Sequence, residues 1–171
     1  AERCVLPRSA FISETSETTD KLVADLIDVT VFKRRINEAS QRNIVANKGA
    51  TAVLNALTER GWKLAVATND SESCAMDHVK ALEWGHLFTS VKGFDSGHGS
   101  KPGPGMVLAA AEECDAHGGM YVMVGDSVHD ILAGRAAGAV TVAIGEQPAA
   151  LQLADARIEE LGELIELVDS L

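Results

Sequence analysis

The sequence predicts an α/β fold, a doubly wound parallel sheet with helices on both faces. After Gly49, short apolar runs alternate with longer segments in which apolar residues recur at helical spacing. Most of the apolar runs lack the interleaved polar residues of a half-exposed strand, so we expect strands that are buried on both faces. Strands that alternate with helices are typical of a parallel sheet.

The predicted elements after Gly49 alternate between helix and strand as far as residue 144. Helices are predicted over residues 50–60, 72–84, 106–117, 127–137 and 161–171, and strands over 63–68, 87–91, 121–124, 140–144 and 156–158. Gly61 follows the first helix, where glycine commonly ends a helix. Residues 69–71 (Asn-Asp-Ser) offer side-chain caps to the second helix. Pro104 stands at the start of the third, where its missing N–H costs nothing.

The first part of the chain shows a weaker pattern. Residues 3–6 (Arg-Cys-Val-Leu) have the character of a strand that Pro7 stops, and residues 13–19 are polar and loop-like. Residues 20–39 carry apolar side chains at helical spacing, which predicts an amphipathic helix. Its basic cluster at residues 33–35 is interpreted as a solvated face.

Composition and charge exclude several classes of partner. The chain has 171 residues, of which 46% are hydrophobic, enough for one domain with a small appendage. Its 25 acidic and 15 basic residues give a net charge of −10, so nucleic acid and anionic membranes would be repelled. The three cysteines lack metal-type spacing and predict reduced thiols. With no apolar run of about 18 residues and no signal-peptide pattern, we expect a cytoplasmic protein.

Two carboxylates follow the predicted strand at 121–124. Asp126 comes just after the strand, and Asp130 lies about one turn into the next helix. In parallel α/β sheets, ligands bind at the carboxyl ends of the strands. Two carboxylates that face one pocket favour a hard cation with oxygen ligands, so we predict a Mg²⁺ site at Asp126 and Asp130. The structural alternative is a helix cap at Asp126 and a solvated Asp130.

Anion-binding groups follow two other predicted strands. Thr68 and Asn69 end the strand at 63–68, directly before a helix N-terminus that favours an anion. Lys101 precedes a stiff Pro-Gly-Pro turn and can act as a point charge for a phosphate oxygen. Each has a structural alternative: Thr68 as the plain end of a strand, and Lys101 as an exposed lysine in a loop. Their conjunction with Asp126 predicts a phosphoryl-transfer site.

Three ordered motifs resemble those of the haloacid dehalogenase-like hydrolases. They are residues 64–69 (Leu-Ala-Val-Ala-Thr-Asn), residues 101–104 (Lys-Pro-Gly-Pro) and residues 125–130 (Gly-Asp-Ser-Val-His-Asp). The chain most resembles phosphoglycolate-phosphatase-like members, whose chain typically ends in a short strand and a leucine-rich helix. The resemblance implies a partial helical cap with a remnant of a first strand at residues 1–48 and an α/β core at residues 49–171.

The resemblance also implies roles for the motif residues. Thr68 and Asn69 would hydrogen-bond the transferring phosphoryl group, and Lys101 would neutralise its charge. Asp126 would hold Mg²⁺, with Asp130 as a second ligand or as a partner through water. These four groups, Thr68, Asn69, Lys101 and Asp126, are the expected catalytic residues. Gly105 departs from the family pattern, because an acidic residue often stands at its position.

A more serious departure concerns the first motif of the family. That motif, Asp-x-Asp-Gly-Thr, supplies the attacking carboxylate, but no Asp-x-Asp precedes Thr68 in this sequence. In the family, the strand that carries this motif lies in the middle of the sheet. Its absence would leave the neighbouring strands unpaired and a groove through the core. Such a groove would invite strand exchange between two chains and so allows a homodimer.

The resemblance favours a Mg²⁺-dependent phosphatase of small phosphomonoesters, of the phosphoglycolate type. It would act through an aspartyl-phosphate whose nucleophile segment is missing here. Its partner is then a small phosphorylated metabolite. The alternative is a catalytically inactive module that keeps the phosphate and Mg²⁺ pocket. Phosphomutase chemistry stays open, whereas the order Thr, Lys, Asp disfavours a phospho-acceptor receiver domain.

Overall fold

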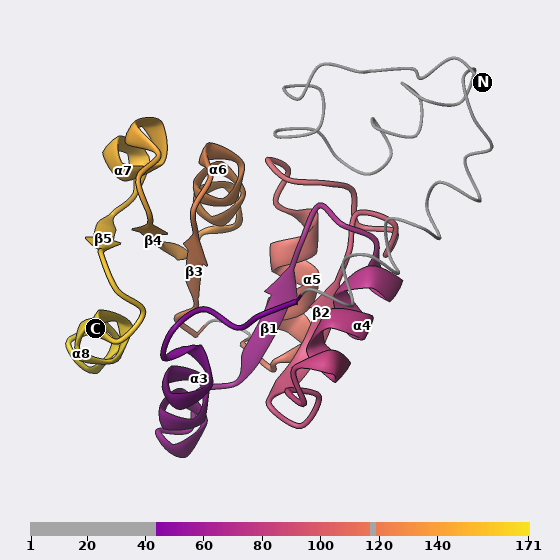
Figure 1. The fold of residues 1–171 in the computed structure, drawn as a ribbon. Helices are drawn as coiled ribbons and strands as arrows, with labels where there is room; N and C mark the ends of the chain where they lie inside the picture. The colour runs from indigo at the N-terminus through magenta and orange to yellow at the C-terminus, as the bar shows by residue number, and fades with distance from the viewer. Residues whose placement is uncertain (1–43, 117–118) are drawn as a thin grey trace, which may run out of the picture.

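The computed structural model describes residues 44–116 and 119–171 (Figure 1). The strand-like residues 3–6, the predicted helix over 20–39 and its basic cluster lie outside the described residues. The proposed division of the chain at residue 48 therefore stays a prediction.

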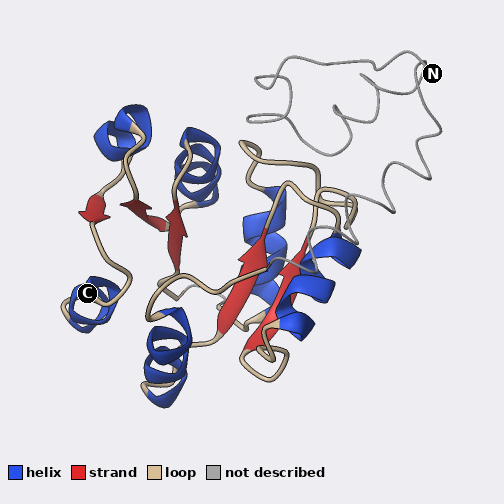
Figure 2. Ribbon diagram, in the orientation of Figure 1, coloured by secondary structure: helices blue, strands red, loops and turns tan. Residues whose placement is uncertain are grey.

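The described elements alternate between helix and strand, as predicted. The helices are α3 (Ala50–Glu59), α4 (Glu72–Ala81), α5 (Gly105–Glu113), α6 (Val128–Ala137), α7 (Pro148–Leu153) and α8 (Glu163–Asp169). The strands are β1 (Leu64–Ala67), β2 (Phe88–Lys92), β3 (Val122–Gly125), β4 (Val140–Ile144) and β5 (Ala156–Ile158). The α/β class is therefore confirmed (Figure 2).

Three helices are clearly shorter than the sequence predicted, and one was not predicted. α4, predicted over 72–84, ends at Ala81, and α8, predicted over 161–171, spans Glu163–Asp169. α5 ends at Glu113, whereas the sequence predicted a helix to residue 117. Asp115 has a φ of 55°, a left-handed conformation that ends a helix, and its carboxylate accepts a bond from Lys63 Nζ at 2.5 Å. Helix α7 was not predicted, because its one and a half turns are too short to show helical periodicity.

Every described strand pair is parallel, and the strands form two sheets. β1 pairs with β2, while β4 lies between β3 and β5. Helices α6 and α7 lie on one face of β3–β5, and α8 lies on the other beside α3 (Figure 1). Helices on both faces of parallel strands make the doubly wound arrangement that the sequence predicted.

Strand β4 carries the core of the larger sheet, because its side chains alternate between the two faces. Val142, which is fully buried, packs with residues of α3, β5 and α8, including Leu57, Ile158 and Leu164. Ala143, one residue on, packs with Ile131 of α6 and Ala150 of α7 on the opposite face. The strand at 140–144, apolar except for Thr141, is therefore buried on both faces, as predicted.

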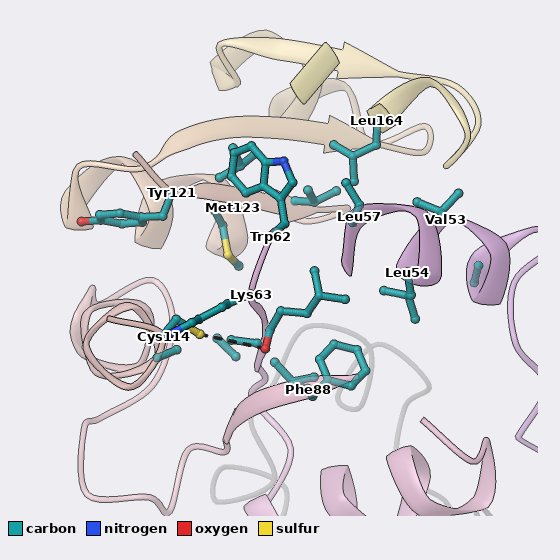
Figure 3. Close-up of a pocket in the computed structure, with 18 of the residues that line it drawn as sticks. Val53, Leu54, Leu57, Trp62, Lys63, Phe88, Cys114, Tyr121, Met123 and Leu164 are labelled. Atoms are coloured by element: carbon teal, nitrogen blue, oxygen red, sulfur yellow. Dashed lines mark hydrogen bonds between the residues drawn. The ribbon is translucent and has the colours of Figure 1, made fainter. Parts of the chain in front are cut away.

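A groove of about 960 Å³ separates the two sheets (Figure 3). It is lined by every residue of β1 and of β3, and its walls come from α3, α5 and α8. Among the described residues, β1 and β3 each have a strand partner on one edge only. No residue of either strand is buried, although both strands are apolar apart from glycine. The expected groove, with an unpaired strand edge on either side of it, is therefore present among the described residues.

None of the described helices has both the length and the apolar character that crossing a membrane requires.

Candidate functional site

Lys101 connects the two sheets at the carboxyl ends of β1 and β3. Its Nζ donates to the carbonyl oxygen of Ala67, the last residue of β1, at 2.7 Å. It also donates to Oδ1 of Asp130, in the first turn of α6, at 2.5 Å. These bonds use two of the three N–H donors of the ammonium, which leaves the third for a ligand. The lysine side chain is only 11% exposed, so it is not the exposed loop residue of the alternative interpretation.

Asp130 is held from both sides. Besides Lys101 on Oδ1, its Oδ2 accepts bonds from the backbone N–H of Ser127 at 3.0 Å and from Ser127 Oγ at 2.6 Å. Ser127 Oγ in turn caps the backbone N–H of Asp130, which completes a capping box at the start of α6. Ser127 is thus the cap of this helix, the role that the alternative interpretation gave to Asp126.

The pKa of Asp130 reflects this environment. Burial opposes ionisation of the carboxyl group, but the charge of Lys101 and the bonds from Lys101 and Ser127 outweigh burial and lower the pKa below its ordinary value. The carboxylate is therefore charged at neutral pH. Both oxygens of Asp130 already accept bonds from protein groups. Metal ligation by Asp130 therefore stays a prediction, and its contact with Lys101 fits a role outside direct metal ligation better.

Gly125 makes room for Asp130 at the end of β3. A Cβ atom at residue 125 would lie 2.2 Å from Asp130 Cβ and 2.7 Å from its Oδ2. Only glycine lets the carboxylate fold back over the strand end toward Lys101. In the sequence, Gly125 stood out only as part of a motif. The close approach of the Asp130 side chain to the backbone of residue 125 explains why glycine is present.

Asn69 holds the backbone of Lys101. Its Nδ2 donates to the Lys101 carbonyl oxygen at 3.1 Å, and its Oδ1 accepts from the Lys101 N–H at 2.9 Å. Both ends of the amide are therefore engaged by one residue. This two-point contact fixes the loop that carries the ammonium, so Asn69 positions Lys101; a direct bond from its side chain to a phosphoryl group stays a prediction.

We expect Asn69→Ala to lower the free energy of unfolding by about 1–3 kcal/mol, because it leaves two part-buried polar groups of Lys101 without partners. Phosphate affinity should fall as well, since Lys101 is no longer held. The matched control is Asn47→Ala, at an exposed asparagine, which should change neither quantity. Urea unfolding and phosphate titration of the two variants separate the roles: weaker binding with unchanged stability would show a phosphate ligand and contradict the positioning role.

Thr68 follows β1 and faces the start of α4. Its N–H donates to Lys92 on the β2 side, and its Oγ accepts from the N–H of Asp70 at 3.1 Å. The hydroxyl hydrogen is then free to bond a phosphoryl oxygen. The N-terminal turn of α4 already has an acidic neighbour, because the N–H of Glu72 donates to Asp95 Oδ1 at 2.7 Å.

Asp126 lies at the mouth of the groove, directly after β3. Its side chain is exposed, and no described residue pairs with its carboxylate. The described residues contain no cluster of three acidic, histidine or cysteine side chains that would form a complete metal site. Mg²⁺, however, is often held by one or two carboxylates with waters and substrate phosphate. The exposed Asp126 carboxylate is compatible with a partial Mg²⁺ site of that kind, which stays a prediction.

Gly105, the departure from the family pattern, has a structural reason. A Cβ atom at residue 105 would lie 2.1 Å from the carbonyl oxygen of His98, so the loop before Lys101 packs against the first residue of α5. An acidic side chain would displace that loop. The sequence signalled this position only by the absence of the expected acidic residue.

Comparison with known proteins gives consistent matches. The family model described as haloacid dehalogenase-like hydrolase matches residues 6–144. A phosphoglycolate phosphatase of Psychrobacter arcticus is 28% identical over 142 residues, 82% of this chain and 62% of the relative. A pyrophosphatase PpaX of Halalkalibacterium halodurans is 31% identical over 117 residues, 68% of this chain and 54% of the relative. The chain thus spans less than two thirds of the length of either relative.

Comparison with solved structures points to the same superfamily. The crystal structure of a subfamily IA hydrolase of this superfamily from Geobacter sulfurreducens superposes with a TM-score of 0.64 at 28% identity. The superposition covers 88% of this chain and 70% of the Geobacter chain. The family model covers most of the chain, and the three motifs lie at the carboxyl ends of the parallel strands. This chain therefore belongs to the haloacid dehalogenase-like hydrolase family.

Proposed function

We propose that this chain forms the phosphate- and Mg²⁺-binding part of a phosphatase that hydrolyses small phosphomonoesters of the phosphoglycolate type. The observation that supports it best is the position of Lys101, which is held by Ala67 and Asp130 where β1 and β3 end. A charged donor in this nearly buried place can bind a phosphoryl oxygen strongly, because water screens it little. The names of the relatives support a phosphatase of this kind.

In this proposal, each group has a separate task. Lys101 binds a phosphoryl oxygen with its third N–H, and the Thr68 hydroxyl donates to another. Asp126 holds Mg²⁺, which when bound would neutralise charge on the phosphoryl group. Asp130 and Asn69 keep Lys101 in place. The attacking carboxylate enters from the carboxyl end of a strand placed between β1 and β3, and this sequence has no Asp-x-Asp to supply it.

We expect Asp126→Asn to weaken Mg²⁺ binding by at least tenfold, because the free carboxylate becomes a neutral amide. Thermal stability should hardly change, since Asp126 is exposed and unpaired among the described residues. The control is Asp70→Asn, which removes an exposed carboxylate at the same edge of the sheet. Calorimetric titration with MgCl₂ measures both variants; equal loss in the two would mean that only the general negative charge matters, and would remove Asp126 as the ligand.

A catalytically inactive phosphate-binding module is the second candidate. It is favoured by one observation: no Asp-x-Asp precedes Thr68, so the expected nucleophile is absent from this sequence. The two functions differ in turnover. A phosphatase predicts Mg²⁺-dependent release of phosphate from 2-phosphoglycolate when a peptide with an apolar strand and Asp-x-Asp is added. Binding of phosphate without any release, with the peptide shown to be bound, would establish the inactive module.

A further inference from the structure

We propose that Gln147, in the loop after β4, positions Asp126 by holding the turn between β3 and α6. The glutamine acts through the backbone of that turn and not through a contact with phosphate or metal. Its effect on Mg²⁺ binding rests on the proposed function, in which Asp126 is the Mg²⁺ ligand. Its hold on the turn depends on contacts within the folded chain alone.

Asp126 has no side-chain contact that directs its carboxylate. The side chain is exposed, and no described residue bonds it. The carboxylate of Asp130, by contrast, is held on both oxygens. The direction of a side chain without partners depends on its backbone and on its rotamer. For Asp126, that backbone is the turn of residues 125–128, from the last residue of β3 to the first residue of α6.

The turn is held both from within α6 and from outside it. Within α6, Ser127 and Asp130 form the capping box. From outside, Gln147 Oε1 accepts a hydrogen bond from the backbone N–H of Val128 at 2.7 Å. Val128 is the first residue of α6, so its N–H is one of those that a helix leaves without an internal partner. Among the described residues, Gln147 is the one outside α6 and its cap whose side chain bonds the backbone of this turn.

The residue type at position 147 does not fit its local place in the chain. Gln147 is the N-cap of α7, a position that favours Ser, Thr, Asp and Asn because their short side chains reach the N–H groups of their own helix. The Gln147 side chain makes no such bond to α7. Its greater length instead spans the distance to α6. A departure from local preference that serves a contact elsewhere is expected of a residue with a positioning role.

The glutamine is itself carried by a fixed element. Helix α7 packs beside α6 (Figure 1), and Ala150 of α7, which is only 1% exposed, packs with Ile131 of α6 and Ala143 of β4. Pro148 at the start of α7 restricts the backbone next to the glutamine. Gln147 directly precedes this helix, so its side chain starts from a place that packing fixes relative to α6.

The loop after β4 also passes close to Asp126 itself. β3 and β4 pair in parallel with Gly125 opposite Ala143, so the two strands end at the same edge of the sheet. Gly145 directly follows β4 with a φ of 94°, and a Cβ atom at this residue would lie 3.8 Å from Asp126 Cβ. The loop therefore lies beside Asp126 before Gln147 reaches the N–H two residues further along the turn.

Three substitutions separate the hydrogen bond of Gln147 from the bulk of its side chain. Gln147→Met keeps the length of the side chain and removes its acceptor. Gln147→Glu keeps an acceptor at the same place. Gln152→Met, at an exposed glutamine of α7 whose side chain bonds no described residue, is the matched control.

Calorimetric titration with MgCl₂ measures the effect on the site. Gln147→Met should weaken Mg²⁺ binding by about tenfold, because the turn no longer holds Asp126 in one direction. Gln147→Glu should bind at least as tightly as the native chain, and Gln152→Met should equal the native chain. Native affinity in Gln147→Met, or a loss of the same size in Gln147→Glu, would overturn the inference.

Hydrogen exchange without Mg²⁺ measures the turn directly. The informative amide is that of Ser127, because its acceptor is Asp130 and not Gln147. This amide should exchange about tenfold faster in Gln147→Met than in the native chain and should recover in Gln147→Glu. The amide of Val142, in the middle strand of its sheet, should be unchanged in all variants. Equal exchange of the Ser127 amide in the native chain and in Gln147→Met would contradict the hold on the turn.

The two measurements distinguish this inference from the proposed function. If the native chain does not bind Mg²⁺ but exchange of the Ser127 amide depends on Gln147, the proposed function is wrong and the hold on the turn stands. If the native chain binds Mg²⁺ and neither quantity responds to Gln147→Met, the proposed function stands and the role of Gln147 is wrong. Faster exchange with unchanged Mg²⁺ affinity would also overturn the inference, because the turn would then not direct Asp126.

Discussion

Replacing Lys101 by methionine should weaken phosphate binding by at least tenfold and lower the free energy of unfolding by about 3 kcal/mol. The lysine is the cation of a nearly buried pair, with side chains of Lys101 and Asp130 only 11% and 9% exposed. Methionine keeps the apolar stem but leaves the Asp130 carboxylate buried without its counter-charge. Removing one partner of such a pair costs more than the pair itself contributes.

The pH dependence of this loss has a definite sign. The folded pKa of Asp130 is lowered, so its contribution to stability is present above the ordinary aspartate pKa of about 3.9 and is lost as pH falls through the lower folded value. The difference in free energy of unfolding between the native chain and Lys101→Met should therefore be largest at pH 7 and should decrease below about pH 4. Urea unfolding at several pH values measures it.

Two control variants separate the loss of the buried pair with Asp130 from the loss of a lysine charge in general. Lys63→Met removes a lysine that also pairs at 2.5 Å, but this pair is exposed and should cost less than about 1 kcal/mol. Lys101→Met/Asp130→Asn should recover part of the lost stability without recovering phosphate affinity. If Lys101→Met cost no more than Lys63→Met, the close contact with Asp130 would not be a feature of the folded protein in solution.

Gly125→Ala should destabilise the protein by about 2–3 kcal/mol and also weaken phosphate binding. The new methyl carbon would lie 2.2 Å from Asp130 Cβ, so the first turn of α6 or the end of β3 must move. Either movement pulls Asp130 away from Lys101. A substitution that touches no ligand would then reduce affinity through the position of the lysine.

The control for this substitution is Gly85→Ala, at an exposed glycine with no atom near the added methyl group. It should leave both stability and phosphate affinity unchanged. Circular dichroism on heating and phosphate titration measure the pair. A stable Gly125→Ala protein with native affinity would show that the end of β3 has room the structure does not show.

Much of the fold could be predicted from the sequence, because its signals are local. The strand at 140–144 matches the prediction in full, since a run that is buried on both faces is largely apolar; Thr141 is its one polar residue. The early end of α5 could not be predicted, because it depends on the left-handed Asp115 and its contact with Lys63. The groove was predictable only through the family resemblance, from the absence of a first motif.

The positions of the candidate residues at the strand ends were predictable, but several of their contacts were not. The strand ends identified Thr68, Lys101 and Asp126 as residues at one edge of the sheet. The sequence could not show that Asn69 holds the backbone of Lys101, or that Ser127 and Lys101 occupy the oxygens of Asp130. The contacts of Lys101 with Asn69 and with Asp130 join residues that are 32 and 29 positions apart, and only the tertiary fold brings them together.

The most direct test of the phosphate site is calorimetric titration of the native chain with inorganic phosphate in the presence of Mg²⁺. We predict binding at a single site that weakens at least tenfold when Mg²⁺ is removed or when Lys101 is replaced by methionine. Absence of binding, or equal affinity in the native chain and in Lys101→Met, would contradict a phosphate site at the ends of β1 and β3.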